Sequence, residues 1–326
     1  MTSGKLLRQL VKAAAEGNPR SLEDAISQVV HEERDKQHHL LANDLERILY
    51  GMGGKAGDNL KNTYGVVPSD KERGLDLLEI FEPARSLNDV ILSEQNKKIV
   101  DRVIVENNQR ALLKSFGLKP AQKILFYGPP GCGKTVTAEA MASDLSLPLV
   151  LVRIDSVISS YLGETAANLR RVFEFIRGQT YVVLFDEFDS LAKERSIAGD
   201  HGELKRVVNA FLQMLDAYKG DSILIAATNH EALLDNAIWR RFDEIIPFKY
   251  PSKAQIKELV SKKLKSVRRD FDMDDAKLIG SLSKKSHADI ERVIIRALKD
   301  MVLGGGQFLT LKHLNEAIKL DQSRNA

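Results

Sequence analysis

The chain has 326 residues, of which 43% are hydrophobic and 29% are charged, as in an ordinary globular protein. The formal net charge of +3 does not favour a nucleic acid or a membrane surface as a partner. Cys132 is the single cysteine, which excludes an intrachain disulfide and favours a reducing, cytoplasmic location. No apolar run approaches the ~18 residues that a membrane helix needs, and Arg8 and Gln9 interrupt the first apolar stretch, so a signal peptide is not predicted.

Residues 1–50 predict a small helical region, because apolar side chains recur at helical spacing in three short segments. Three such helices bury little apolar area alone, so two roles stay open: binding a protein partner or substrate, or packing on the rest and supporting assembly. A metal site at the nearby histidines is not favoured, because the surrounding charged residues are typical of a solvated face. These histidines are His31, His38 and His39.

Residues 51–84 predict a glycine-rich linker that ends in an apolar docking segment. Five glycines between Gly51 and Gly65 interrupt regular structure, and Pro68 follows them. The apolar residues between Leu75 and Phe81 could then dock on the following domain. The linker would let the helical region range over the mouth of an assembly.

Residues 85–250 predict an α/β domain with a parallel sheet covered by helices on both faces. Short, continuous apolar runs alternate with helical patterns, as right-handed crossover connections require. The expected strands are residues 123–127, 149–154, 181–185, 222–227 and 245–248. In such sheets the ligand crevice lies at the carboxyl ends of the strands.

Residues 251–326 predict a smaller, all-helical domain. Helical patterns cover 256–264, 275–282, 288–301 and 311–320. A basic run between Lys262 and Arg269 is better explained as a solvated helix face than as a nucleic-acid interface.

A phosphate-binding loop follows the first strand of the α/β domain. Its motif is G-x-x-x-x-G-K-T, with these residues and the one after them: Gly128, Pro129, Pro130, Gly131, Cys132, Gly133, Lys134, Thr135 and Val136. The glycines let backbone N–H groups turn toward phosphate oxygens, and the following helix directs its positive dipole end at them. Lys134 would contact the β- and γ-phosphates of ATP, and the Thr135 hydroxyl would bind Mg²⁺.

Polar residues at the ends of two other strands complete a nucleotide-hydrolysing site. Asp186 follows an apolar strand and would hold Mg²⁺ together with Thr135. Glu187 is positioned to orient and polarise the attacking water. Asn229 ends another strand, where its amide would bind the γ-phosphate or the water, a role compatible with capping the next turn.

Two adjacent arginines, Arg240 and Arg241, precede Phe242. They would either form ordinary surface ion pairs or stabilise the γ-phosphate held by a neighbouring subunit.

Together these motifs resemble the AAA ATPases, within the AAA clade proper, over about residues 85–320. The resemblance rests on residues 128–135, 184–189 and 226–243. It implies an α/β ATPase core, a helical lid and a homohexameric ring. It assigns Asn229 as the first sensor, with Arg240 and Arg241 as arginine fingers acting in trans. In this family, two residues usually separate the two arginines. Here the arginines are adjacent, which leaves open which of them reaches the γ-phosphate of the neighbouring subunit.

The resemblance also implies further contacts. The adenine would lie near Asp89 and Val90, and the lid segment around His287 and Ala288 would pack near the nucleotide without a second sensor arginine. The first pore loop would comprise Tyr161, Leu162 and Gly163, with the tyrosine gripping extended polypeptide. The alternative for Tyr161 is packing in the core. Residues 197–203 would form a second pore loop.

The function implied is an ATP-hydrolysing motor that remodels or unfolds protein substrates. The alternative is a nucleotide-gated regulatory ATPase that switches a partner enzyme such as a protease. The layout is loosely similar to stand-alone bacterial AAA ATPases partnered with a subtilase-like protease in phage defence. A nucleic-acid remodeller is disfavoured by the near-neutral charge.

Overall fold

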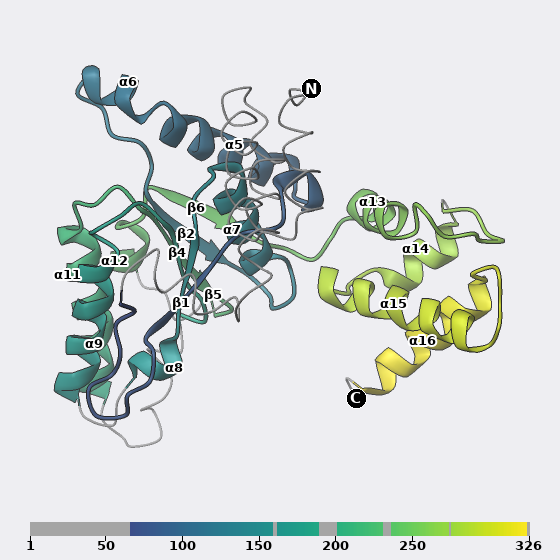
Figure 1. Cartoon of the computed structure of the whole chain (residues 1–326). Helices are drawn as coiled ribbons and strands as arrows, with labels where there is room; N and C mark the ends of the chain where they lie inside the picture. Colours follow the sequence, from purple (N-terminus) through teal and green to yellow (C-terminus); the bar gives the residue numbers. More distant parts are fainter. Residues whose placement is uncertain (1–65, 159–161, 189–200, 231–235, 274, 325–326) are drawn as a thin grey trace, which may run out of the picture. The chain divides into compact units, whose positions relative to one another are not determined.

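The structure is a computed structural model, and it describes residues 66–158, 162–188, 201–230, 236–273 and 275–324. The chain divides into two compact units, Met1–Val66 and Val67–Ala326. The helices predicted for residues 1–50 and the glycine-rich part of the predicted linker lie outside the described residues. The account below therefore concerns the second unit (Figure 1).

Within the described residues, six strands form one sheet in the order β1-β3-β4-β5-β2-β6. The strands are β1 (Leu78–Phe81), β2 (Lys123–Tyr127), β3 (Leu149–Val152), β4 (Val182–Phe185), β5 (Ile223–Thr228) and β6 (Glu244–Pro247). Strands β2 to β6 run parallel to one another. All residues of the central strands β4 and β5 are buried, as the continuous apolar runs of a doubly covered parallel sheet require.

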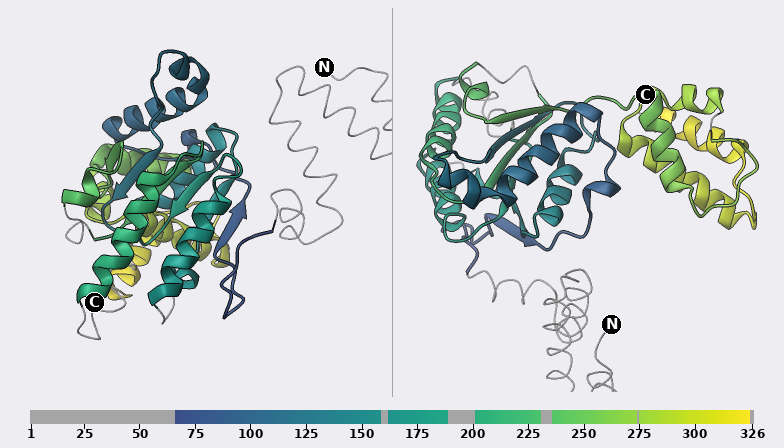
Figure 2. Two further views of the ribbon diagram at one scale, coloured as in Figure 1. Left: turned by 90° about the vertical axis from the view of Figure 1, so that its left-hand side faces the viewer. Right: turned by 90° about the horizontal axis from the view of Figure 1, so that it is seen from above.

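Helices cover both faces of this sheet (Figures 1 and 2). The helices of this domain are η1 (Leu87–Asp89), α5 (Glu94–Asn108), α6 (Arg110–Ser115), α7 (Lys134–Asp144), α8 (Ile154–Val157), α9 (Leu162–Phe175), α11 (His201–Ala217) and α12 (Asn236–Trp239). On the face of α5 and α7, Met141 packs in one buried cluster with Leu184 of β4. On the opposite face, Phe185 of β4 contacts Phe173 of α9 and Phe211 of α11, with ring centroids 5.7 and 5.0 Å apart. The side chains of consecutive strand residues thus point to opposite faces of the sheet. The predicted α/β fold is confirmed.

The structure adds an edge strand that the sequence pattern predicts only as a docking segment. Strand β1 pairs antiparallel with β3, with Leu78 opposite Val152 and Phe81 opposite Leu149. Leu77 and Leu78 are buried. The apolar segment therefore docks by adding a strand, and the sheet is mixed rather than wholly parallel.

The helical segment over residues 94–115 is divided at Gln109 into α5 and α6. The side chain of Asn107 donates hydrogen bonds to the carbonyl oxygens of Val103 (2.9 Å) and Ala121 (2.8 Å). An asparagine that binds nearby backbone in this way competes with helix continuation, which accounts for the break.

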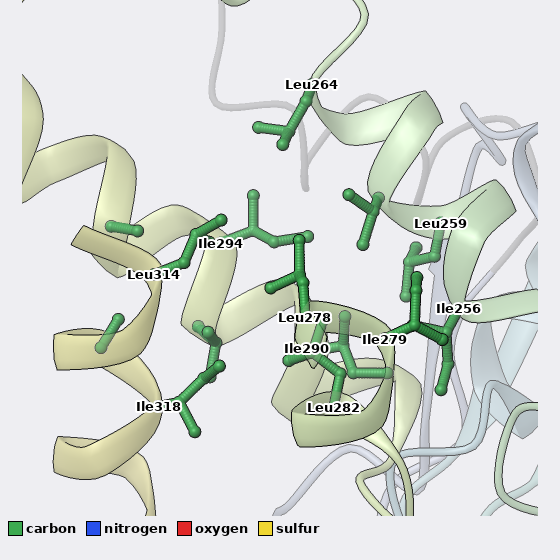
Figure 3. Close-up of a cluster of buried hydrophobic side chains, with 14 of the residues drawn as sticks. Ile256, Leu259, Leu264, Leu278, Ile279, Leu282, Ile290, Ile294, Leu314 and Ile318 are labelled. Atoms are coloured by element: carbon green, nitrogen blue, oxygen red, sulfur yellow. The ribbon is translucent and has the colours of Figure 1, made fainter. Parts of the chain in front are cut away.

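In the described part of the C-terminal region, which we call the lid, four helices are present: α13 (Lys253–Lys263), α14 (Ala276–Leu282), α15 (His287–Leu303) and α16 (Leu311–Arg324). Their aliphatic side chains pack in a separate hydrophobic cluster that contains Leu282, Ile290 and Ile318 (Figure 3). Ser286 caps α15 with a reciprocal capping box, and the Thr310 hydroxyl before α16 accepts a hydrogen bond from the His313 N–H (3.3 Å). None of the described helices combines the length and apolar character that crossing a bilayer requires.

Candidate nucleotide-binding site

The strand order brings the predicted motifs to one edge of the sheet. Strand β5 lies between β2, which leads into the phosphate-binding loop, and β4, which leads to Asp186. Backbone hydrogen bonds continue this pairing beyond the strands, from Gly128 N to Thr228 O (3.3 Å) and from Phe188 N to Ala227 O (2.9 Å). Asn229 consequently lies between the loop and the acidic pair, as the carboxyl-end rule predicts.

The loop glycines have backbone conformations that L side chains rarely adopt. Gly128 has a φ of +136°, Gly131 of +71° and Gly133 of +99°. A Cβ atom added at Gly128 would lie 1.9 Å from the carbonyl oxygen of Phe248. Phe248 follows β6 and donates its N–H to Tyr127 O (2.7 Å), so the loop rests directly on the neighbouring strand's extension. Gly133 then begins α7, whose N-terminal N–H groups form an anion-binding cradle.

The side chain of Lys134 is buried and fully paired. Its ammonium group donates to Gly128 O (2.7 Å), Pro129 O (3.0 Å) and Asn229 Oδ1 (2.7 Å). These three acceptors match the three N–H donors of an ammonium group, which offsets the cost of burying its charge. The predicted phosphate-binding lysine and the predicted sensor asparagine are thus in direct contact.

Thr135 and Asp186 are also in contact, across the gap between α7 and the end of β4. The Thr135 hydroxyl donates to Asp186 Oδ2 at 2.6 Å. A hydroxyl and a carboxylate form a hard oxygen donor pair, which suits Mg²⁺ because this ion takes few protein ligands and keeps several waters. In the part of the chain that the structure describes, no group of three or more His, Cys, Asp or Glu residues is arranged to hold a metal. The pair therefore fits a Mg²⁺ bound together with phosphate oxygens.

Glu187 has an unusual backbone conformation for a residue with a side chain. Its φ of +51° lies in the left-handed region, which costs of order 1–3 kcal/mol for a non-glycine residue. Its N–H donates to Asp186 Oδ1 (2.9 Å), and the residue is exposed. The turn thus directs successive carboxylates differently, with Asp186 bound to Thr135 and Glu187 open to solvent.

The two adjacent arginines differ in their contacts. Arg241 Nε lies 2.8 Å from Asp216 Oδ2 on α11 of the same chain. Arg240 is exposed, and among the described residues it has no hydrogen-bond or ion-pair partner. Of the two, Arg240 is the one whose charge is available to another molecule.

The lid contacts the loop through backbone and small side chains. The Ala288 N–H donates to Gly131 O (3.0 Å). A Cβ at Gly131 would lie 2.7 Å from Ser286 Oγ and 3.1 Å from Ala288 Cβ. Both ring nitrogens of His287 are buried and have no hydrogen-bond partner among the residues that the structure describes, and burial lowers the pKa of this imidazole. A lowered pKa keeps the ring neutral, with one donor and one acceptor for a ligand.

The segment predicted to line the adenine joins the core to the lid. Asp89 closes η1 with a capping box to Ser86, and Val90 is half-buried. Ile91 is buried in the lid's hydrophobic cluster. Lys262 of α13 donates to the carbonyl oxygen of Asn88. The predicted adenine-lining residues from the core and the lid therefore belong to connected elements.

The predicted pore loops fall partly outside the described residues. Tyr161, with its alternative of core packing, and the second predicted pore loop at 197–203 lie largely outside the described residues. Leu162 begins α9, and Gly163 is exposed in its first turn. The sequence does not predict that Phe248 and Lys262 support the site. Phe248 lies near it because of the strand order, and Lys262 lies near it because of the packing of the lid.

The chain matches the model of a family described as "ATPase family associated with various cellular activities (AAA)" over residues 124–250. An uncharacterized AAA family ATPase from Sinorhizobium fredii is 38% identical over 326 residues, covering 100% of this chain and 97% of the relative. A putative 26S proteasome regulatory subunit homolog from Methanothermobacter marburgensis is 31% identical over 81% of this chain and 70% of its own length.

The peroxisomal ATPase pex6 of Schizosaccharomyces pombe is 36% identical over 200 residues, 59% of this chain but only 21% of the relative. Among solved structures, the FIGL-1 AAA domain aligns with a TM-score of 0.60 and 22% identity, covering 75% of this chain and 85% of that one. This likeness shows the fold.

Proposed function

Because the chain belongs to the AAA family of ATPases, we propose that it hydrolyses ATP to ADP and phosphate at the site built on residues 128–135. The observation that carries the proposal is the contact between Thr135 and Asp186, 2.6 Å apart, with Glu187 adjacent and open to solvent. This contact supports a metal-binding role for Thr135 and Asp186 and a water-activating role for Glu187 beside the phosphate-binding loop.

The roles of the chain's own residues follow from their chemistry. The N–H groups at the start of α7 and the Lys134 ammonium bind the phosphates of ATP. Thr135 and Asp186 would hold Mg²⁺, which would supply positive charge to offset that of the phosphate groups. Glu187 accepts a proton from the water that attacks the γ-phosphorus, while the bond to the β-phosphate oxygen breaks. Asn229 orients the water or the γ-phosphate.

We further propose a homohexameric ring in which Arg240 completes the neighbouring subunit's site. Its guanidinium is exposed, whereas Arg241 is engaged by Asp216 within the chain. An arginine supplied in trans stabilises charge on the transferred phosphoryl group and accelerates hydrolysis by 10³–10⁵-fold in other enzymes. The difference in contacts favours Arg240 over Arg241 as the residue that acts in trans.

The substrate of the motor is proposed to be protein. The names of two relatives, a proteasome regulatory subunit homolog and a peroxisomal ATPase, support a role in handling proteins. Tyr161 is the proposed gripping residue. The name of the first of these relatives also supports the second candidate, a nucleotide-gated ATPase that switches a partner enzyme such as a protease.

Subunit mixing tests the trans arrangement together with hydrolysis. Lys134→Ala rings and Arg240→Ala rings are each expected to be inactive. Mixed rings should recover activity, because an intact loop in one subunit then meets an intact arginine in the next. Arg241→Ala is the matched control and should keep most activity alone. Failure of mixing to restore activity, with ring assembly confirmed by light scattering, would refute the trans role of Arg240.

A further inference from the structure

Arg240 lies in a short segment, residues 238–242, whose other side chains are turned toward the chain itself. The segment joins the end of α12 to the start of β6. Ile238 and Phe242 are buried, and Arg241 is paired with Asp216. Of these five residues, all of which the structure describes, Arg240 is the exposed one. The segment therefore presents a single guanidinium group to the outside.

Trp239, the residue before Arg240, packs on the strand that leads into the phosphate-binding loop. Its indole meets the ring of Tyr127 edge-on, with ring centroids 5.0 Å apart and an interplanar angle of 86°. Tyr127 is the last residue of β2, and Gly128 of the loop follows it directly. Because aromatic pairs prefer defined relative orientations, this contact fixes the direction of the end of α12.

Tyr127 is a firm support, because the backbone around it is bound on both sides. Its carbonyl oxygen accepts a hydrogen bond from Phe248 N (2.7 Å), and the next residue, Gly128, donates its N–H to Thr228 O (3.3 Å). The carbonyl oxygen of Gly128 in turn accepts a hydrogen bond from the Lys134 ammonium group (2.7 Å). A side chain that rests on the Tyr127 ring is thereby held in place relative to the chain's own phosphate-binding loop.

The other attachments of this segment hold the exposed arginine less directly. The Asp243 carboxylate accepts hydrogen bonds from Gln122 N and Lys123 N, both at 2.9 Å, but these bonds fix the start of β6. The Arg241 ion pair is partly exposed on both sides, and exposed pairs contribute little. Trp239 is adjacent to the exposed arginine and meets a buttressed ring, so it is the attachment best placed to orient that arginine.

We propose that Trp239 is a positioning residue, which holds Arg240 through the contact with Tyr127 in the orientation that the neighbouring subunit's site requires. This inference rests on the proposed action of Arg240 in trans. A guanidinium group must meet the phosphoryl group from one direction, and a displacement of about 1 Å can lower a rate by on the order of 10²-fold. The aromatic contact supplies the rigidity that such an approach needs.

Steady-state kinetics of Trp239→Leu test the positioning role. The kcat should fall about tenfold or more, while KM for ATP stays near that of the wild type, because the chain's own phosphate-binding loop is unchanged. Trp239→Phe should restore most of the kcat, since a phenyl ring can still meet Tyr127. Tyr127→Leu removes the same contact from the other side, and it should reproduce the fall in kcat even if Trp239→Leu does not fold.

A matched control breaks an aromatic pair elsewhere in the core. Phe175 is half-buried, as Trp239 is, and its ring stacks on Tyr181 with centroids 5.8 Å apart. Phe175→Leu should keep the wild-type kcat, and unfolding midpoints show that each variant is folded. Wild-type kcat in folded Trp239→Leu would overturn the proposal. An equal fall in Phe175→Leu would overturn it too, because the effect would then be general loosening of the core.

Subunit mixing separates an effect on the neighbour from an effect on the chain's own site. In rings mixed equally with Lys134→Ala, Trp239→Leu activity should exceed the mean of the two separate preparations by roughly fivefold, because half of the intact loops then meet a correctly held arginine. If Trp239 only supported its own loop, activity would stay at that mean, and the proposal would be wrong.

Arg240→Ala, mixed with Lys134→Ala in the same way, is the reference for this experiment. If Arg240→Ala is rescued by mixing and Trp239→Leu is not, the positioning role is wrong and the proposed trans arrangement stands. If Arg240→Ala is not rescued, the trans arrangement itself fails, and the positioning role fails with it.

Discussion

The core and the lid contribute to the site in different ways. The core supplies charged and polar side chains at strand ends, such as Lys134 paired with Asn229 and Thr135 paired with Asp186. The lid supplies a backbone N–H at Ala288 and close packing against Gly131. The charged groups of the site therefore come from the core, and the lid adds backbone contact, packing and the neutral ring of His287. Variants that separate these contributions test the difference.

The largest effect is expected for Lys134→Ala in the core. Removing the ammonium leaves the phosphates without their buried point charge, which costs about 2–5 kcal/mol for a hydrogen-bonded charge pair. ATP affinity should fall by roughly 100-fold or more, as measured with a fluorescent nucleotide. The unfolding midpoint serves as the control, and wild-type affinity in a folded variant would remove Lys134 from the site.

A cavity in the lid should lower stability and leave the chemistry intact. Leu282 is fully buried in the lid cluster, so Leu282→Ala should lower the lid's free energy of unfolding by about 2–5 kcal/mol. Leu184→Ala makes the matched cavity in the sheet. By calorimetry, the two variants should shift different unfolding transitions. A single transition shifted equally by both would show that core and lid unfold as one unit.

The smallest and sharpest comparison is between two loop glycines. Gly131→Ala places a methyl group against Ser286 and Ala288, whereas at Gly133 an added Cβ meets nothing within 4 Å. Both positions have positive φ, so the backbone strain, about 1 kcal/mol, is shared. Gly131→Ala should therefore weaken ATP binding beyond Gly133→Ala by disturbing the lid. Equal losses would mean that lid contact contributes nothing to affinity.

The residues that sequence could place are those whose roles depend on local motifs. The spacing from Gly128 to Thr135 fixes a strand, a loop and a helix, and the two acids directly follow an apolar strand. The rule that parallel strands end at one edge then brings the groups together. For this reason the sequence predicts that Thr135 and Asp186 lie close together, although 51 positions separate them in the chain.

What sequence could not place depends on strand order and on tertiary packing. The four-residue strand β1 has no distinctive alternation, and its pairing with β3 depends on an edge left free by the fold. Phe248 supports Gly128 only because β6 lies beside β2. Likewise, the distinction between Arg240 and Arg241 depends on Asp216, which lies on a distant helix.

The measurement that tests the account most directly is ATP binding and turnover by Glu187→Gln. The amide keeps the size of the carboxylate but cannot accept the water's proton, while the phosphate cradle and the Thr135–Asp186 pair stay intact. We expect ATP affinity near that of the wild type and turnover lower by about 10²–10⁴-fold, the usual contribution of a general base. Wild-type turnover by Glu187→Gln would contradict the assignment of the catalytic carboxylate and the mechanism built on it.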